Sequence, residues 1–387
     1  MADNKDKKVL NVPHLRFPEF SGEWECSTIG REFELYSGNT PSRLDKEQFN
    51  GNVNWISSGE LKEHYIYDTK EKITEEAASC NNLRLLPIGT FVIAIYGLEA
   101  EGVRGTGSVI QKKSTISQAC MAFSSKGTIT NEFLYSWYKK HGNLIGLKYA
   151  QGTKQQNLSY DIISQFRISY PSITEQKKLQ DFISLIDERI ATQNKIIEDL
   201  KLLKSAIAET VFNNMKGHLT TNLSTICNIV KGKQVNGEEL SGKGKYYVMN
   251  GGITPSGYYD QCNTPDNTIS ISEGGNSCGY VQYNKSSFWS GGHCYTLQDI
   301  TCGVDIQYLF HYLKRYESNI MNLRIGTGLP NIQKKDLENF RIALPPTNVQ
   351  KEISTCLTAI EDKIMVEVKW LNSAQKEKQH FLRQMFI

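Results

Sequence analysis

Residues 152–212 of this 387-residue chain match residues 326–386 without a gap. Upstream the match becomes looser, although Cys120 still aligns with Cys294. A match of this length indicates a duplicated unit, so the chain must fold as two related halves. Each half has a variable front and a similar back. Matching pairs include Gly152 with Gly326, Asn157 with Asn331, Pro171 with Pro345, Gln176 with Gln350 and Phe212 with Phe386.

The back of each half has the pattern of a long helix. Proline stands before both segments, and the capping patterns Ser172-x-x-Glu175 and Thr347-x-x-Gln350 mark their starts. Apolar residues then recur at alternating spacings of three and four, with polar interruptions at equivalent places in both copies. Such a heptad pattern predicts helices over residues 171–216 and 345–387, each roughly 60 Å long.

An apolar stripe on a helix of this length has to be covered, and the other helix of the same chain is the simplest partner. A pseudo-two-fold relation between the halves predicts an antiparallel pair that holds one globular unit at each end. A parallel homodimer through one helix is the alternative. The predicted pairing positions are Leu179, Ile183, Ile186, Ile190, Ile197, Leu200, Ile207, Val211, Ile353, Leu357, Ile360, Ile364, Leu371, Phe381 and Met385.

The front of each half has the alternating pattern of short strands with single helices. We therefore predict a mixed α/β (α+β) fold in which two globular domains are joined by the two antiparallel heptad helices. The expected parts are a flexible tail over 1–11, a first domain over 12–170, a first helix over 171–216, a second domain over 217–344 and a second helix over 345–387. The expected strands are 53–56, 90–95, 166–169, 246–249, 268–272 and 340–343, and the expected helices are 131–141 and 306–316.

Charge and composition argue against several classes of protein. The formal net charge is +3, and residues 12–170 carry 17 basic and 17 acidic side chains. This balance argues against a stand-alone, non-specific nucleic-acid binder. No apolar run is long enough for a membrane span, and the start of the chain lacks the apolar region of a secretory signal. With nine scattered cysteines expected to be reduced, we expect a cytoplasmic protein without membrane contact.

Motifs for catalysis are incomplete. The segment from Gly237 to Gly244 nearly fits a phosphate-binding loop but lacks the hydroxyl that ligates magnesium. Gly275-x-Ser277-x-Gly279 fits a nucleophile elbow, yet a strand pattern follows it where a helix is required. Cysteine and histidine show no metal-ligand spacing. We therefore predict no catalytic residue, no metal and no cofactor bound by this chain itself.

The nucleic-acid signal is local. Between Phe133 and Tyr160 there are four lysines and no acidic residue, and the equivalent stretch of the second half has five basic residues and one acid. Both stretches end in Gly-Thr-x-x-x-Asn, and lysines and amides are the side chains that pair with phosphates and base edges. The candidate DNA contacts are Ser57, Ser58, Lys62, Lys148, Thr153, Lys154, Gln155, Gln156, Asn157, Asn250, Arg324, Thr327, Asn331 and Lys334. For any single residue, a solvated turn is an equally good interpretation.

Two variable α/β units, each followed by a similar heptad helix, resemble the specificity subunit of type I restriction-modification systems. The opening from Asn11 to Trp24, which reads NVPHLRFPEFSGEW, is also similar to the start of that family in Gram-positive bacteria. The resemblance covers essentially the whole chain. Its most specific parts are the helices and the Gly-Thr-x-x-x-Asn segments.

The resemblance implies two target-recognition domains, each reading one half of an interrupted, asymmetric DNA site. It implies that the helix pair sets the spacer and docks two modification subunits, which use S-adenosylmethionine to methylate a flipped adenine. Two restriction subunits would add ATP- and magnesium-dependent translocation and cleavage. Two other hypotheses are a non-catalytic adaptor that binds proteins through its helices and a stand-alone hydrolase that uses Ser277.

Overall fold

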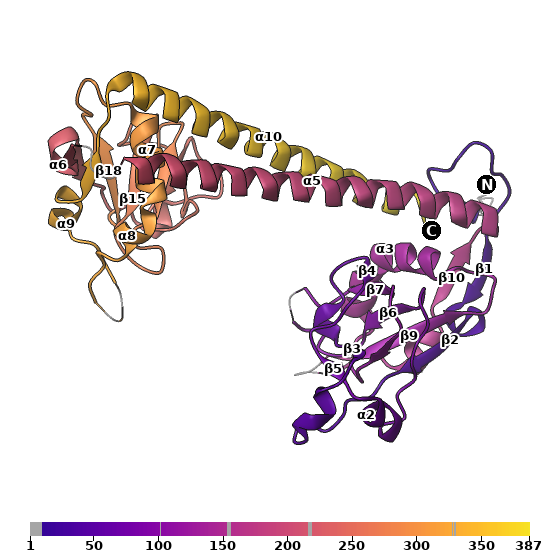
Figure 1. Ribbon diagram of the computed structural model, residues 1–387. Coiled ribbons are helices and arrows are strands. Elements are labelled where there is room, and N and C mark those ends of the chain that lie inside the picture. Colours follow the sequence, from indigo (N-terminus) through magenta and orange to yellow (C-terminus); the bar gives the residue numbers. More distant parts are fainter. Residues whose placement is uncertain (1–9, 101, 153–155, 216–218, 327, 329) are drawn as a thin grey trace, which may run out of the picture. The chain divides into compact units, whose positions relative to one another are not determined.

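The computed structural model describes residues 10–387 except 101, 153–155, 216–218, 327 and 329 (Figure 1). The chain forms two compact units. Unit 1 comprises Met1–Thr192 and Leu371–Ile387, and unit 2 comprises Gln193–Trp370. Each unit therefore contains one globular domain together with part of each long helix.

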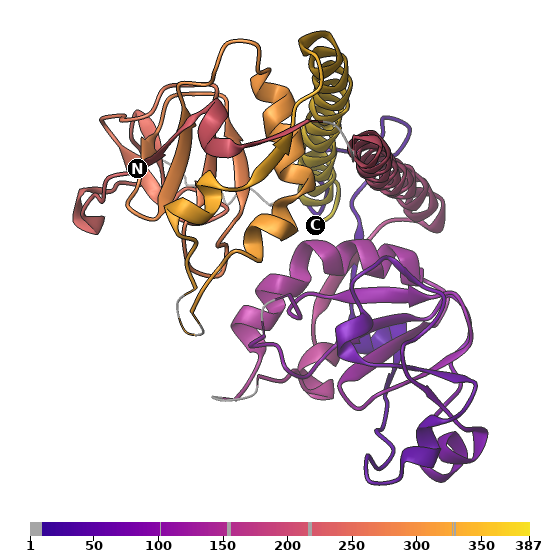
Figure 2. The same cartoon turned by 60° about the vertical axis from the view of Figure 1, so that its left-hand side comes forward.

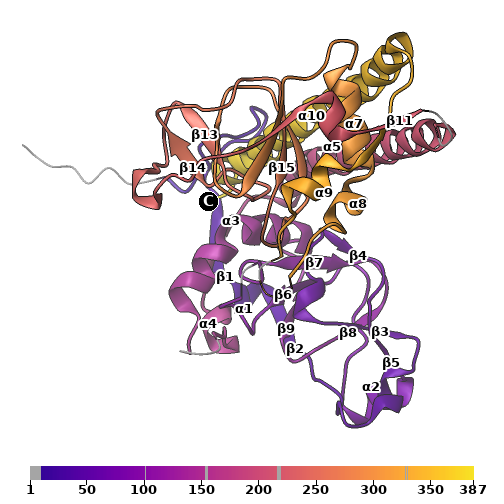
Figure 3. The ribbon, with the colours of Figure 1, turned by 90° about the vertical axis from the view of Figure 1, so that its left-hand side faces the viewer.

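The globular domain of unit 1 is built on the antiparallel core of a five-stranded sheet with the order β2-β9-β6-β7-β4. A second sheet, β5-β3-β8, lies beside the short helix α2 (Figure 3), and β1 pairs with β10. Phe91 and Phe123 pair across the main sheet, and α3 packs on it through Tyr135 and Tyr138. The elements are β1 (Glu25–Thr28), α1 (Ile29–Glu32), β2 (Phe33–Ser37), β3 (Val53–Ile56), β4 (Tyr65–Ile66), β5 (Lys72–Ile73), α2 (Glu75–Cys80), β6 (Phe91–Ala94), β7 (Gly107–Ile110), β8 (Ser114–Ile116), β9 (Cys120–Ser125), α3 (Asn131–Tyr149), α4 (Tyr160–Ser164) and β10 (Arg167–Tyr170).

The domain of unit 2 repeats this plan with a four-stranded sheet of order β12-β18-β15-β16. Its smaller sheet, β14-β13-β17, combines one antiparallel and one parallel pair, as β5-β3-β8 does in unit 1. The duplication thus extends through the fronts of both halves, where the sequences no longer match. The elements are β11 (Thr220–Asn222), α6 (Leu223–Ile226), β12 (Asn228–Lys231), β13 (Tyr246–Met249), β14 (Gly257–Tyr259), β15 (Thr268–Ser272), β16 (Val281–Asn284), β17 (Trp289–Ser290), β18 (Cys294–Gln298), α7 (Ile306–Arg315), α8 (Glu317–Met321), α9 (Lys334–Glu338) and β19 (Arg341–Ala343).

The two long helices are α5 (Ile173–Asn214) and α10 (Thr347–Met385), which can be followed in Figures 1 and 2. In unit 1 the start of α5 meets the end of α10, where Phe182 and Phe381 have ring centroids 5.0 Å apart. In unit 2 the later part of α5 meets the earlier part of α10, where Lys204 pairs with Glu361 at 3.0 Å. The helices therefore run antiparallel within each unit, as the pseudo-two-fold argument predicts.

Burial along both helices follows the predicted heptad pattern. Each predicted pairing position is buried or half-buried, while most of the residues between them are exposed. The polar residues that interrupt the seam also contact each other. Gln193 donates a hydrogen bond to the carboxylate of Glu367 on the facing helix. A polar pair at a seam position favours one register over its neighbours.

A buried glutamine joins each long helix to its own domain. The Gln176 side chain accepts a hydrogen bond from the Thr130 backbone N–H at 2.9 Å and donates to the carbonyls of Thr128 and Pro171. Thr130 is the N-cap residue of α3. The first turn of α5 is thereby fixed to the start of the domain's main helix.

Gln350 makes the same three contacts in unit 2. It accepts from the backbone N–H of Asp305, the N-cap residue of α7, at 2.9 Å and donates to the carbonyls of Gly303 and Pro345. Neither Gln350 nor Glu175 completes its predicted capping box. Glu175 has a different partner. Its carboxylate binds Arg16 at 2.7 Å instead, which ties the segment before β1 to α5.

The far end of each long helix packs on the other domain's main helix. Phe386, just after α10, contacts Phe133 of α3 with ring centroids 5.3 Å apart. Phe212, near the end of α5, contacts Tyr308 of α7 at 5.8 Å. Phe133 and Tyr308 hold equivalent places in the two copies, so each helix starts at one domain and ends on the other in the same way.

The predicted strands are all present: three have the predicted ends, and the ends of the other three differ by at most one residue. The predicted helix from Asn131 is longer than expected and continues to Tyr149. Across the described part of the chain, no helix combines the length and apolar character that a membrane crossing requires.

Candidate nucleic-acid interface

The described ends of the two Gly-Thr-x-x-x-Asn segments are held in the same way in the two domains. In the first, Gln151 and Asn157 exchange two backbone hydrogen bonds of 2.9 Å. In the second, Ile325 and Asn331 exchange two of 2.8 and 3.0 Å. The glycine of each segment has a positive φ, 116° at Gly152 and 97° at Gly326, which only glycine adopts easily. The repeated sequence thus gives the same backbone pairing at the described ends of both segments.

Each loop is held against the end of a central strand. The N–H of Leu158 donates to the Ile95 carbonyl at 2.9 Å just after β6, and the N–H of Ile332 donates to the Glu273 carbonyl at 2.8 Å just after β15. The same backbone hydrogen bond occurs in both domains, so the residue that supplies the carbonyl occupies the same place in each domain. Ile95 and Glu273 are therefore equivalent positions.

In the first domain, the described candidates have mixed roles. The backbone N–H of Gln156 donates to Glu99 at 2.7 Å, and this bond is the main cause of the lowered pKa of Glu99. The Gln156 side chain accepts from Arg104 at 3.2 Å. Asn157 is half-buried, and within the described residues its side-chain oxygen has no hydrogen-bond partner. Glu99, Arg104 and Gln156 thus form one polar cluster.

The other first-domain candidates lie apart from that loop or are already engaged. The Ser57 hydroxyl donates to Glu60 at 3.0 Å, so it serves the local turn. Ser58 is half-buried, whereas Lys62 and Lys148 are exposed, and the Lys148 ammonium lies 5.3 Å from the Tyr149 ring centroid. The candidates outside the described residues are Thr153, Lys154, Gln155 and Thr327.

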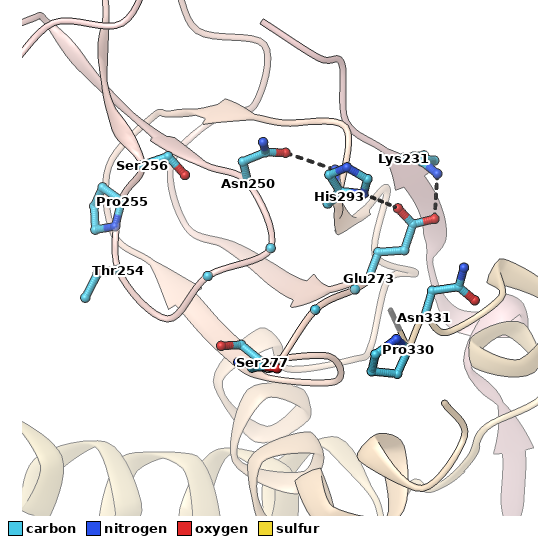
Figure 4. A pocket seen from close by; sticks show the side chains of 15 residues that line it. Lys231, Asn250, Thr254, Pro255, Ser256, Glu273, Ser277, His293, Pro330 and Asn331 are labelled. Atoms are coloured by element: carbon cyan, nitrogen blue, oxygen red, sulfur yellow. Dashed lines mark hydrogen bonds and ion pairs between the residues drawn. The ribbon is translucent and has the colours of Figure 1, made fainter. Parts of the chain in front are cut away.

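In the second domain, a pocket of about 780 Å³ brings two candidates together, Asn250 and Asn331 (Figure 4). Asn250 follows β13, and its side-chain oxygen accepts from the backbone N–H of His293 at 3.1 Å. Asn331 is exposed at the end of the Gly-Thr-x-x-x-Asn loop. The pocket is therefore lined by one residue from each of two segments in which the sequence separately predicted DNA contacts. Arg324 and Lys334 are exposed and do not line it.

The same pocket contains a charged cluster that sequence reasoning missed. The Glu273 carboxylate is 10% exposed and pairs with Lys231 at 2.5 Å and with His293 at 3.5 Å. The Tyr295 hydroxyl also donates to it at 3.1 Å. Burial, followed by the nearby Glu273 charge, raises the pKa of Tyr295, so this phenol remains a donor. Lys231 and His293 are 52% and 64% exposed and lie at the mouth of the pocket.

Ser277 lines this pocket, but its surroundings are unlike a nucleophile elbow. The strand β16 follows it, as predicted, and no helix begins at that point. No group of three histidine, cysteine or carboxylate side chains suited to a metal occurs within the described residues. The donors and amides of the site instead suit hydrogen bonding to a polar ligand.

Comparison with known proteins identifies the family. Residues 21–202 and 216–374 match the model of the type I restriction modification DNA specificity domain. The chain belongs to this family. It is accordingly a DNA specificity subunit of a type I restriction-modification system, and the specificity subunit is not an enzyme. The hydrolase and adaptor hypotheses are not favoured by this match.

Relatives agree with the assignment. The specificity subunit is 23% identical to the type I restriction enzyme MjaIX specificity subunit of Methanocaldococcus jannaschii over 92% of this chain and 90% of that protein. It is 28% identical to a putative type I specificity subunit of Mycoplasma genitalium, in a match that spans 45% of this chain and about half, 46%, of that protein.

Solved structures share the fold. The S subunit of a type I system from M. genitalium aligns over 97% of this chain and 99% of its own, with a TM-score of 0.70 and 19% identity. A second structure, which describes complex assembly and conformational transition of the type I R-M system, aligns over 94% of this chain and 97% of its own. Its TM-score is 0.56 and its sequence identity is 15%. Specificity subunits of such systems assemble with other subunits and with DNA.

Proposed function

We propose that the specificity subunit reads a bipartite, asymmetric DNA site, with one half-site bound by each domain. One observation carries this proposal: two domains built on the same plan place different side chains at equivalent positions, such as Ile95 and Glu273. A shared framework with different contacts is what two different half-sites require. Base edges in the major groove distinguish all four base pairs, so unlike donors and acceptors select unlike sequences.

The helix pair would set the distance between the half-sites and dock two modification subunits. The two helices pair in antiparallel orientation, and each begins at one domain and ends on the other. Both features support a spacer of fixed length. The chemistry would come from those partners, which would bind S-adenosylmethionine and methylate adenine, and from two restriction subunits that would use ATP and magnesium. The near-neutral charge of this chain fits a complex in which partners supply much of the phosphate contact.

The test is methylome sequencing. The specificity subunit is expressed with its modification subunit in a host that lacks adenine methylation, and methylated adenines are mapped. We expect one interrupted motif with two unlike halves and a constant spacer. Methylation at a continuous or palindromic motif would contradict the proposal. A control without the specificity subunit should show no motif.

A further inference from the structure

The charged cluster of Lys231, Glu273 and His293 occupies positions that are uncharged in the first domain. Backbone bonds define the equivalence. The N–H of Glu273 donates to the His293 carbonyl at 2.9 Å, and the N–H of Ile95 donates to the Ala119 carbonyl at the same distance. Lys231 pairs with Tyr295 in the sheet, as Ser37 pairs with Met121. The positions that correspond to Lys231, Glu273, His293 and Tyr295 are thus Ser37, Ile95, Ala119 and Met121.

The fold does not need this cluster. Ile95 is 3% exposed and fills the equivalent position with an apolar side chain. Burying a carboxylate costs free energy unless partners compensate it, and a well-packed apolar replacement is often as stable or more stable. A structural role therefore does not explain why the second domain carries Glu273. The cluster lies instead at the pocket where Asn250 and Asn331 meet.

The accessible donor of the cluster is the Lys231 ammonium. Glu273 is nearly buried, and its Oε1 already receives bonds from the Lys231 ammonium and the Tyr295 hydroxyl. Lys231 and His293 project to the mouth of the pocket with about half or more of each side chain exposed. A lysine paired with a carboxylate attracts phosphate less than a free lysine does, but its position is better defined. Positioned donors suit an acceptor edge, and guanine O6 and N7 form that edge in the major groove.

We propose that Lys231, held in place by Glu273 and with His293 beside it, reads a guanine in the half-site of the second domain. Glu273 is a positioning residue, since it acts through the Lys231 ammonium. This inference rests on the proposed function, because it names the specificity determinants of one of the two readers.

The first experiment is methylome sequencing of variants assembled with the modification subunit. In one variant, Lys231→Ser, Glu273→Ile and His293→Ala replace the cluster with the residues of the first domain. We expect the second half-site to lose its preference for guanine at one position, while the first half-site and the spacer stay unchanged. The conservative variant Lys231→Gln, at a half-exposed side chain, should give the same relaxation if the triple variant does not fold.

The second experiment measures DNA binding by the assembled complex, using oligonucleotides in which 7-deazaguanine replaces each guanine of the second half-site. At one position, the wild type should lose about 5- to 150-fold in affinity, and Lys231→Gln should show little further loss there. Glu273→Gln should lower this discrimination and steepen the salt dependence, because Lys231 is freed to attract phosphate. A merely structural carboxylate would not change the salt dependence.

Lys334→Gln is the matched comparison for a phosphate contact in the same domain. It should weaken binding to all sequences equally and reduce the salt slope by about one. The same uniform result for Lys231→Gln, or unchanged second half-sites in every variant, would overturn this inference while leaving the proposed function standing. Loss of the bipartite motif in the wild type would overturn the proposed function itself.

Discussion

His64 shows how one side chain can join a domain to both long helices. Its ring lies between Tyr65 and Tyr135, with centroids 3.9 Å from each, and it pairs with Glu132 at 2.8 Å and with Asp187 of α5 at 3.5 Å. Asp187 in turn pairs with Lys378 of α10 at 2.5 Å. Two aromatic faces and two carboxylates form a site that favours imidazolium.

This environment predicts a pH-dependent stability. Burial alone would lower the pKa of His64, but Asp187 and Glu132 outweigh burial and raise it. A raised pKa contributes stability that is present below the unfolded value of about 6.5 and is lost as pH rises through the folded value. The difference in unfolding free energy between the wild type and His64→Gln should therefore shrink from about pH 6 to pH 9, as measured by urea denaturation.

The control substitution is His380→Gln, at an exposed histidine of α10. At the acidic end the carboxylate acts in the opposite direction. Burial would raise the pKa of Asp187, but His64 and Lys378 together lower it, so its contribution is lost as pH falls through that lowered value. A difference that grows toward alkaline pH would contradict this account of His64.

The two buried glutamines make a second prediction at this scale. Gln176→Leu and Gln350→Leu each remove three hydrogen bonds and leave a backbone N–H without its partner. Each should lower the free energy of unfolding by about 1–3 kcal/mol. The exposed Gln375→Leu is the control and should change it little. A loss in only one of the pair would show that the two junctions are not equivalent.

At the scale of the element, the helix seam was predictable because its apolar spacing is long and repeated. Leu357 is 0% exposed, whereas Leu202 on the facing helix is 68% exposed. Leu357→Ala should therefore lower the unfolding free energy by about 2–5 kcal/mol, and Leu202→Ala should stay within about 0.5 kcal/mol. Equal effects in thermal or urea unfolding would mean that the seam does not hold the helices.

The charged cluster was not predictable from the same sequence. Lys231, Glu273 and His293 are far apart along the chain and come together only when three strands pair. Comparing the copies does not reveal them easily either, because the segment from Glu273 to His293 is four residues shorter than the segment from Ile95 to Ala119. Residue type and position in the repeat do not separate Ser57, which serves a turn, from Asn250, which lines the pocket.

The helix pair also predicts how the spacer can be changed. Inserting four residues, about one turn or 6 Å, after both Thr192 and Trp370 keeps the Gln193 and Glu367 register and keeps both helix ends on their domains. We expect the methylated motif to gain one or two base pairs of spacer with both half-sites unchanged. An unchanged spacer in the methylome would count against the helices as its determinant.

At the scale of the whole molecule, Gln176 and Gln350 join the helices to the two domains in the same way. We therefore expect each domain to recognise its half-site independently of the other. Replacing residues 218–340 with those of another family member should change only the second half-site, because Gln350 contacts mainly backbone atoms of the domain. The methylome of the exchanged subunit checks this. Changes in both half-sites would show that the domains are coupled.

The reciprocal helix ends have a consequence for shorter chains. A fragment holding residues 12–216 would contain Phe212 but not Tyr308, on which Phe212 packs. It would also contain Phe133 but not Phe386, which packs on Phe133 in the whole chain. Two identical fragments could then complete each other. The resulting homodimer would read the same half-site twice in opposite orientations, which converts an asymmetric target into an inverted repeat.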